Sequence, residues 1–172
     1  IPAGRLTGRQ ALVFGLALAA TAFGLFWTRV NELSAWLALG GLLFYVFVYT
    51  MWLKRTSTQN IVIGGAAGAV PALVGWAAVT GTVGLTAWVL FAIVFVWTPP
   101  HFWALAMRYS GDYRAAGIPM LPVVRGPQET RKQILLYSLV LFGTSLLLVP
   151  VASMRLVYGG AAVLPRGRFL CP

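Results

Sequence analysis

Acidic side chains are almost absent from this chain. Its 172 residues include three Asp and Glu against thirteen Lys and Arg, which gives a formal net charge of +10. Only 9% of the residues are charged, 59% are hydrophobic, and the mean hydropathy is +0.83. A soluble domain of this length has too little interior to bury so much apolar surface. The composition therefore excludes a soluble globular protein, and the single cysteine, Cys171, excludes an internal disulfide framework.

The chain contains several long runs of apolar residues. Since a helical membrane span needs about 20 mostly apolar residues, we predict spans at residues 11–27, 33–53, 61–80, 85–107 and 134–154. A sixth run begins near Leu156 but is interrupted by Pro165, Arg166, Gly167 and Arg168. The connections at 28–32 and 81–84 are short, so the spans that they join should be antiparallel neighbours. The expected fold is all-α, a polytopic transmembrane helix bundle, with residues 1–172 forming a single transmembrane domain.

Basic residues collect at alternate ends of these runs. If successive spans alternate in direction, nine basic residues fall on one side of the membrane, and Arg29 and Arg155 fall on the other. The positive-inside rule then predicts that the richer side faces the cytoplasm, or the matrix in an organelle. Because these residues lie at span ends and not along one soluble face, we expect no nucleic acid as a partner. The nine are Arg5, Arg9, Lys54, Arg55, Arg108, Arg114, Arg125, Arg131 and Lys132.

The fourth run ends in the motif WTPPHFW at residues 97–103, which holds the only histidine. Pro99 and Pro100 lack backbone N–H groups, so the helix is predicted to kink or break there. Carbonyls freed at membrane depth need water or a polar cavity beside them. His101 is then either a substrate contact that faces a central cavity or a structural histidine with satisfied hydrogen bonds.

Two polar clusters are predicted to share one membrane face. The loop YSGDYRAAGIPMLP at residues 109–122 holds the only aspartate, Asp112, which is either a functional carboxylate or a turn-capping residue. The other cluster, KRTSTQN at residues 54–60, ends in five hydrogen-bonding side chains that can cap the next helix. Its basic residues indicate either an anion site at a helix terminus or a simple membrane anchor. Together the clusters suggest an intramembrane enzyme that acts on an anionic substrate.

The third run is rich in small residues. Gly64 and Gly68 form a small-xxx-small pair, with Gly65 and Ala69 one position further on. This spacing is typical of closely packed membrane helices, and the other interpretation is that the glycines make room for a flat ligand. Pro71 is predicted to kink the helix.

Three stretches resemble a known family of membrane enzymes. They are IPAGRLTGRQAL from Ile1, KRTSTQNIVIGGAAGAVPALVGWAAVTG from Lys54, and WTPPHFWALAMRYSGDYRAAGIPMLPVV from Trp97. They are similar to the protoheme IX farnesyltransferases (heme o synthases) of the UbiA superfamily of intramembrane prenyltransferases, over residues 1 to about 158. The resemblance implies nine transmembrane helices around a central cavity that opens to the membrane and the cytoplasm. It also implies transfer of the farnesyl group of farnesyl diphosphate to a vinyl group of heme b, with addition of water, to form heme o for terminal oxidases.

The resemblance further implies roles for particular residues. Asp112 and His101 are expected to be catalytic, and Asp112 would hold Mg²⁺ that binds with the diphosphate. His101 would ligate heme iron or orient the water that captures the cation. The residues expected to bind substrate are Lys54, Arg55, Arg108, Tyr109 and Tyr113. The aromatic residues expected to stabilise positive charge are Trp97, Phe102, Trp103 and Tyr109.

The resemblance predicts an internal fragment with five complete spans and part of a sixth. The family's first acidic motif would lie upstream of Ile1, so the fragment alone is expected to be inactive. Residues 165–168 depart from the apolar helix that the family has there. The expected location is the bacterial inner membrane, or the mitochondrial inner membrane in a eukaryote, with heme a synthase or a terminal oxidase assembly as a contact. Two alternatives remain, a sister prenyltransferase acting on an aromatic quinone precursor and a membrane transporter or channel.

Overall fold

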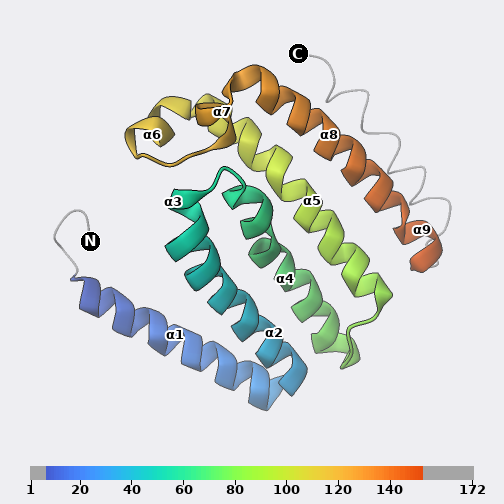
Figure 1. Cartoon of the computed structure of the whole chain (residues 1–172). Helices are drawn as coiled ribbons and strands as arrows, with labels where there is room; N and C mark the ends of the chain where they lie inside the picture. Colours follow the sequence, from blue (N-terminus) through green and yellow to red (C-terminus); the bar gives the residue numbers. More distant parts are fainter. Residues whose placement is uncertain (1–6, 153–172) are drawn as a thin grey trace.

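The computed structural model describes residues 7–152, which form helices and short connections without a strand among them (Figure 1). Five helical segments in this range are long and apolar enough to cross a membrane. They are α1 (Gly8–Arg29), the continuous segment Glu32–Thr56, α4 (Asn60–Thr80), α5 (Leu85–Arg108) and the segment Gly126–Val151, which comprises α8 (Gly126–Leu146) and α9 (Leu148–Val151). These segments confirm the five predicted spans and the all-helical membrane fold. The sixth predicted run lies outside the described residues.

The second span changes its helix type along its length. It begins as α2 (Glu32–Leu43), continues as the π-helix η1 (Phe44–Leu53) and ends as α3 (Lys54–Thr56). In the π-helical part the Lys54 N–H donates to the Tyr49 carbonyl, and the Thr50 hydroxyl donates to the Tyr45 carbonyl at 2.9 Å. Each bond spans five residues, so side chains five positions apart lie one turn apart. Short π-helical segments are uncommon and occur frequently at functional sites.

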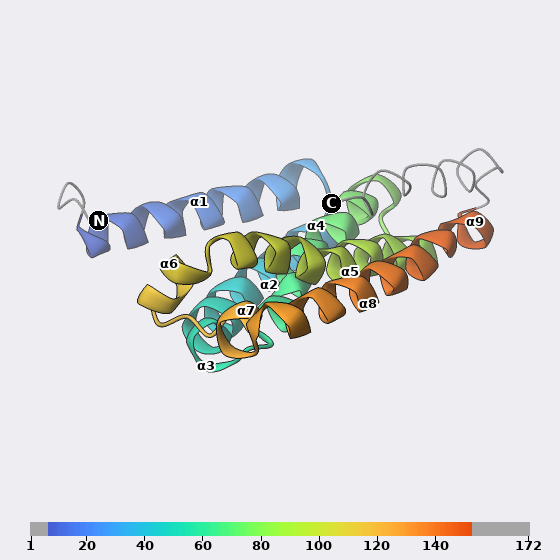
Figure 2. The ribbon, with the colours of Figure 1, turned by 90° about the horizontal axis from the view of Figure 1, so that it is seen from above.

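The five spans pack in chain order as an open arc. Among the described elements α1 packs only against α2, and the order continues from α2 to α4, from α4 to α5 and from α5 to α8. In both ribbon views α1 and α8 lie on opposite sides of the molecule (Figures 1 and 2). The two predicted antiparallel pairs, α1 with α2 and α4 with α5, are confirmed. At one end, α6 (Ser110–Ala115) and α7 (Leu121–Val124) connect α5 to α8.

Asn31 fastens the α1–α2 corner to the end of α4. Its Oδ1 accepts a hydrogen bond from the Ser34 N–H at 2.8 Å, which caps α2, and its Nδ2 donates to the Ala77 carbonyl at 2.8 Å. The buried Ser34 hydroxyl donates to the Val74 carbonyl at 3.4 Å. Gly81 ends α4 with a left-handed φ of 69°, which glycine adopts without strain. Backbone carbonyls at this end of α4 are therefore satisfied inside the protein.

The small residues of α4 divide between two faces. A Cβ atom on Gly65 would lie 3.2 Å from the Cβ and Cγ2 atoms of Thr98, and Ala69 is fully buried. Close helix packing therefore explains Gly65 and Ala69. Gly64 and Gly68 face elsewhere, because a Cβ atom on Gly64 would overlap the Tyr49 ring and one on Gly68 would meet nothing within 4 Å.

The double proline does not break the helix, and the alternative prediction of a kink stays a prediction. α5 continues from Leu85 to Arg108 through Pro99 and Pro100, both of which are buried. Proline has a φ that fits a helix, so its cost there is lost hydrogen bonding and a clash with the preceding turn, which packed neighbours can offset in a membrane helix. The Thr98 hydroxyl donates to the Val94 carbonyl at 2.7 Å in the same turn.

Candidate functional site

A large apolar cavity lies between the second span, α4 and α5. Its volume is about 840 Å³. Along α4 its lining extends from Ile61 to Ala78, which corresponds to about 26 Å at 1.5 Å per residue. Its lining includes the aromatic side chains of Tyr45, Tyr49, Trp97 and Phe102. Thr98, Gly64 and Gly68 also line it.

Among residues 7–152, no charged side chain lines this cavity. Polar atoms in its lining come from Tyr45, Tyr49, Trp97 and Thr98, and the Thr98 hydroxyl is already bonded to a backbone carbonyl. A roomy cavity with apolar and aromatic walls suits a hydrocarbon chain or a flat hydrophobic ring. Gly64 and Gly68 belong to this wall, as does Gly65, which also packs against Thr98, and the interpretation of the glycines as room for a ligand stays a prediction.

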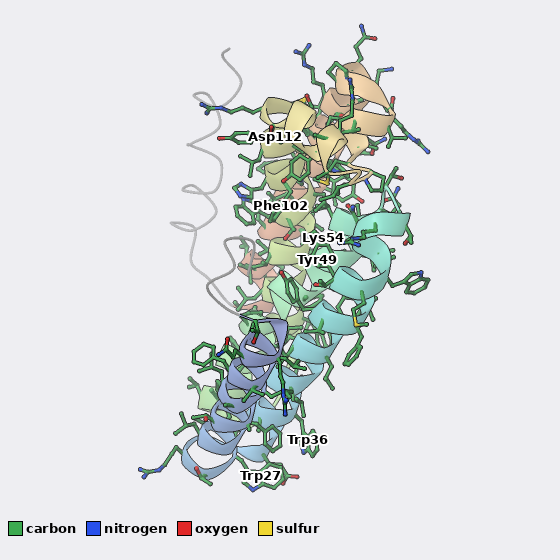
Figure 3. All side chains as sticks on the ribbon, turned by 90° about the vertical axis from the view of Figure 1, so that its left-hand side faces the viewer. Trp27, Trp36, Tyr49, Lys54, Phe102 and Asp112 are labelled. Carbon is green, nitrogen blue, oxygen red and sulfur yellow. The ribbon has the colours of Figure 1, made fainter. Side chains whose placement is uncertain are left out.

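A second cavity brings the two polar clusters together. We call it the basic pocket; its volume is about 400 Å³ and it is lined by Thr50, Met51, Lys54, Arg55, Ala116 and Ile118. Lys54 and Arg55 come from the end of the second span, and Ala116 and Ile118 come from the loop that follows Asp112. Lys54 and Asp112 lie toward the same end of the molecule in the side-chain view, opposite Trp27 and Trp36 (Figure 3). Two cationic side chains in one pocket suit an anionic group such as a diphosphate.

One packed cluster touches both cavities. Its buried members are Ile61, Ala106 and Met120, and Tyr49, Tyr113, Ile118 and Val123 pack against them. Tyr49 and Ile61 also line the apolar cavity, whereas Ile118 also lines the basic pocket. The cluster therefore borders both cavities, and we call it the partition.

The residues around Asp112 lie beside this partition. Asp112 is exposed on α6, and its neighbour Tyr113 is half-buried in the cluster. Arg108 and Tyr109 are exposed at the end of α5, with the guanidinium carbon of Arg108 at 5.8 Å from the Tyr109 ring centroid. Within the described residues, neither Asp112, Arg108 nor Tyr109 lines either cavity. The binding roles predicted for these residues stay predictions.

His101 lies next to the apolar cavity. Its exposed ring stacks on Trp97 with centroids 4.5 Å apart and meets the edge of Phe102 at 5.5 Å. Trp97 and Phe102 line the cavity, and His101 is not among the lining residues. Of the other aromatic residues named from the sequence, Trp103 is buried against Tyr137 at 5.3 Å, away from the cavity lining.

The described residues do not make a magnesium site by themselves. They contain no group of three or more His, Cys, Asp and Glu side chains that could hold a metal ion. Asp112 offers one carboxylate, whereas Mg²⁺ requires near-octahedral oxygen coordination.

Sequence reasoning missed Tyr45 and Tyr49 and assigned the wrong role to Asn60. α4 begins at Asn60 without a side-chain cap, so the capping prediction for residues 56–60 was wrong. Asn60 is only 1% exposed, its Nδ2 donates weakly to the Lys54 carbonyl at 3.4 Å, and its Oδ1 has no partner. A buried unpaired acceptor is costly. The sequence offered two signals for these residues. Asn60 stands in the same polar run as Lys54, and Tyr45 and Tyr49 are four residues apart.

An arc of membrane helices with an apolar cavity beside a basic pocket suits an intramembrane enzyme for a molecule with an anionic head and an apolar body. The sequence pattern of the UbiA prenyltransferase family matches residues 1–171, and the chain belongs to this family. Over 158 residues it is 58% identical to a Gloeobacter violaceus protein named protoheme IX farnesyltransferase, covering 92% of this chain and 52% of that relative. A Synechocystis sp. protein of the same name is 54% identical over 171 residues, 99% of this chain and 54% of the relative.

The chain thus spans about half the length of these curated relatives. No solved structure matches it.

Proposed function

We propose that a full-length protein carrying this chain transfers the farnesyl group of farnesyl diphosphate to a vinyl group of heme b, with addition of water, and so forms heme o. The observation that carries the proposal is the 54–58% identity, over nearly the whole chain, to relatives named protoheme IX farnesyltransferase. The two cavities support it, because farnesyl diphosphate joins an anionic head to an apolar chain.

The proposed chemistry follows from these residue types. Lys54 and Arg55 bind the diphosphate in the basic pocket through charge-assisted hydrogen bonds. The allylic C–O bond breaks and the diphosphate leaves with the electron pair. The π electrons of the heme vinyl group form the new bond to the farnesyl carbon, and water captures the cation beside the pyrrole with loss of a proton. Trp97 and Phe102 in the cavity wall stabilise positive charge through their ring faces.

In this proposal Asp112 helps to bind the diphosphate leaving group. Mg²⁺ bound with the diphosphate would neutralise its charge, and Asp112 would supply one oxygen ligand. The remaining ligands would come from other parts of the longer protein, so the chain of residues 1–172 on its own is expected to make no heme o. Turnover by the purified 172-residue chain, free of any full-length enzyme, would contradict this expectation.

His101 has two proposed roles that spectroscopy separates. If His101 ligates the heme iron, His101→Ala should shift the heme absorption spectrum and weaken heme binding, while farnesyl diphosphate affinity stays the same. If it orients the capturing water, the spectrum should stay unchanged and only turnover should fall. A variant that loses stability alone would show that His101 is structural.

The five spans make this an integral membrane protein. We further propose that the protein lies in the bacterial cytoplasmic membrane with its basic end facing the cytoplasm. We also propose that it contacts heme a synthase or a terminal oxidase assembly. Single cysteines at Ser57 and Gln128, in a Cys171→Ser background, should both react with a reagent applied from the cytoplasm. Reaction of either position only from the other face would overturn this topology.

The test of function is product analysis. The purified full-length protein, given heme b, farnesyl diphosphate and Mg²⁺, should form heme o, as identified by mass spectrometry. Prenylation of an aromatic quinone precursor in place of heme b would assign the protein to a sister prenyltransferase. Transport of a solute without covalent change of either substrate would point to the transporter alternative.

A further inference from the structure

Tyr49 and Gly64 make an unusually close contact in the cavity wall. A Cβ atom built on Gly64 would overlap the Tyr49 ring, with the ring's Cε2 atom at 2.8 Å. Both residues line the apolar cavity, and Tyr49 comes from η1 whereas Gly64 comes from α4. The absence of a side chain at residue 64 therefore lets the ring lie close against α4.

The same ring belongs to the partition between the two cavities. Tyr49 packs against the cluster of Ile61, Ala106 and Met120, and Ile118 from the basic pocket packs against the same cluster. Tyr49 is half-buried, and its other ring neighbour is Tyr45, with centroids 5.4 Å apart. The ring is thus the part of the partition that is held between a glycine and a second cavity-lining aromatic side chain.

The π-helix sets the distance from this ring to the basic pocket. The Lys54 N–H donates to the Tyr49 carbonyl, so Lys54 follows Tyr49 by one helical turn. Tyr49 lines the apolar cavity, and Lys54 lines the basic pocket. Tyr49 is thus a residue of the apolar cavity that lies one helical turn from the basic pocket, where a ligand with its head at Lys54 and its chain in the apolar cavity would run.

We propose that Tyr49, seated on Gly64, is the neck between the basic pocket and the apolar cavity, and that it positions the part of a prenyl diphosphate that joins head to chain. This inference rests on the proposed function. In this role Tyr49 is a positioning residue, because its ring sets the passage and its hydroxyl is not required. The close contact with Gly64 holds the Tyr49 ring against α4, and this position leaves the passage between the basic pocket and the apolar cavity open.

The test compares glycine-to-alanine variants of the full-length protein. Gly64→Ala pushes the ring off α4 and into the passage, so kcat/KM for farnesyl diphosphate should fall about tenfold or more. Gly68→Ala adds a methyl group to the same wall, where nothing lies within 4 Å, and should cost less than about threefold. Gly40→Ala in α2 also meets nothing within 4 Å, lies outside both cavity linings and should leave kcat/KM unchanged.

A double-mutant cycle assigns the effect to the ring. In a Tyr49→Phe background, which keeps the ring, Gly64→Ala should still cost about tenfold. In a Tyr49→Ala background no ring is left to displace, so Gly64→Ala should cost less than about threefold. Equal losses in both backgrounds would overturn the proposal, as would equal losses for Gly64→Ala and Gly68→Ala.

Inhibition by inorganic diphosphate distinguishes a specific effect on the neck from a general disruption of the fold. Diphosphate carries the head without the chain, so its inhibition constant should change less than about twofold in Gly64→Ala while the KM for farnesyl diphosphate rises. Loss of both would show a structural role and would contradict the neck. If Gly64→Ala does not fold, Tyr49→Trp enlarges the ring while leaving the sequence of α4 unchanged, and it should raise the same KM while sparing diphosphate inhibition.

Wild-type protein that makes no heme o would instead refute the proposed function. An active wild-type enzyme whose Gly64→Ala variant behaves like Gly40→Ala would refute only the neck.

Discussion

The two ends of the helix arc differ in how their polar groups are used. At one end Lys54 and Arg55 line a pocket, Asp112 is exposed, and the Asn60 Oδ1 is buried without a partner. At the other end the Asn31 side chain makes hydrogen bonds to both Ser34 and Ala77. The side-chain view shows Asp112 and the Trp27–Trp36 pair at these opposite ends (Figure 3).

Aromatic packing reinforces the contrast. Phe23, Trp27 and Trp36 form a mutual cluster with ring centroids 5.3 to 6.1 Å apart, and the Trp36 Nε1–H donates to Glu32 at 3.4 Å. Tryptophan is favoured where a membrane protein meets the interface between lipid and water. The comparison indicates that one end is organised to bind a ligand and the other to hold helices together. Substitutions at the first end should change turnover, and those at the second should change stability.

The largest effect is expected from Asp112→Asn in the full-length enzyme. Loss of one charge at a preorganised site lowers the rate by about 10² to 10³, while heme binding and the thermal midpoint should change little because the side chain is exposed. The matched control is Glu129→Gln in the first turn of α8, which removes the only other carboxylate at this end of the described chain. Near-normal activity of Asp112→Asn at low Mg²⁺ would contradict the metal role.

Removing a charge from the basic pocket should have the next largest effect. Lys54→Gln and Arg55→Gln each lose a charge-assisted hydrogen bond worth about 1.5–3 kcal/mol, so the KM for farnesyl diphosphate should rise about tenfold or more. Arg29→Gln, which removes a cation at the opposite end, should leave this KM unchanged. Equal effects of all three substitutions would mean that general charge, and not the pocket, attracts the substrate.

Asn31→Ala should lower stability without changing turnover at low temperature. The variant loses the cap of α2 and the bond to α4, which together should cost about 1–2 kcal/mol. Asn31→Asp keeps the acceptor for Ser34 but loses the donor to Ala77, and should fall between Asn31→Ala and wild type in thermal midpoint. A change in KM for farnesyl diphosphate in either variant would break the division between the two ends.

Trp27→Leu should give the smallest effect. It removes ring contacts with Phe23 and Trp36, each worth about 0.5–1.5 kcal/mol, and partly replaces the apolar area. A small decrease in thermal midpoint with unchanged kcat is expected. A loss of activity as large as that of Lys54→Gln would show that the aromatic end also serves catalysis.

The sequence predicted the spans well because long apolar runs are a strong signal in a chain with so few charges. It also placed the two polar clusters at the same end, since alternating spans leave no other arrangement. It did not predict the π-helix at 44–53, because an apolar run has no feature that marks a change of hydrogen-bond period. Of the break or kink predicted at Pro99 and Pro100, the break does not occur, because burial against neighbours outweighs the local preference for it.

Contacts between segments were beyond the sequence. The glycine run of α4 indicated close packing, but the pattern does not tell which glycine meets Thr98 and which meets Tyr49. That distinction depends on how α4 is rotated between the second span and α5.

The central claim is that farnesyl diphosphate binds with its head in the basic pocket and its chain in the apolar cavity. Photo-cross-linking tests this claim most directly. A farnesyl diphosphate analogue with a diazirine at the end of its chain should label the full-length protein at cavity residues far from Lys54, such as Val74, Ala78 or Phe26. Inorganic diphosphate in excess should prevent the labelling, because it competes for the basic pocket. Labelling of α6 or of the exposed Trp52 of η1, unaffected by diphosphate, would contradict the account.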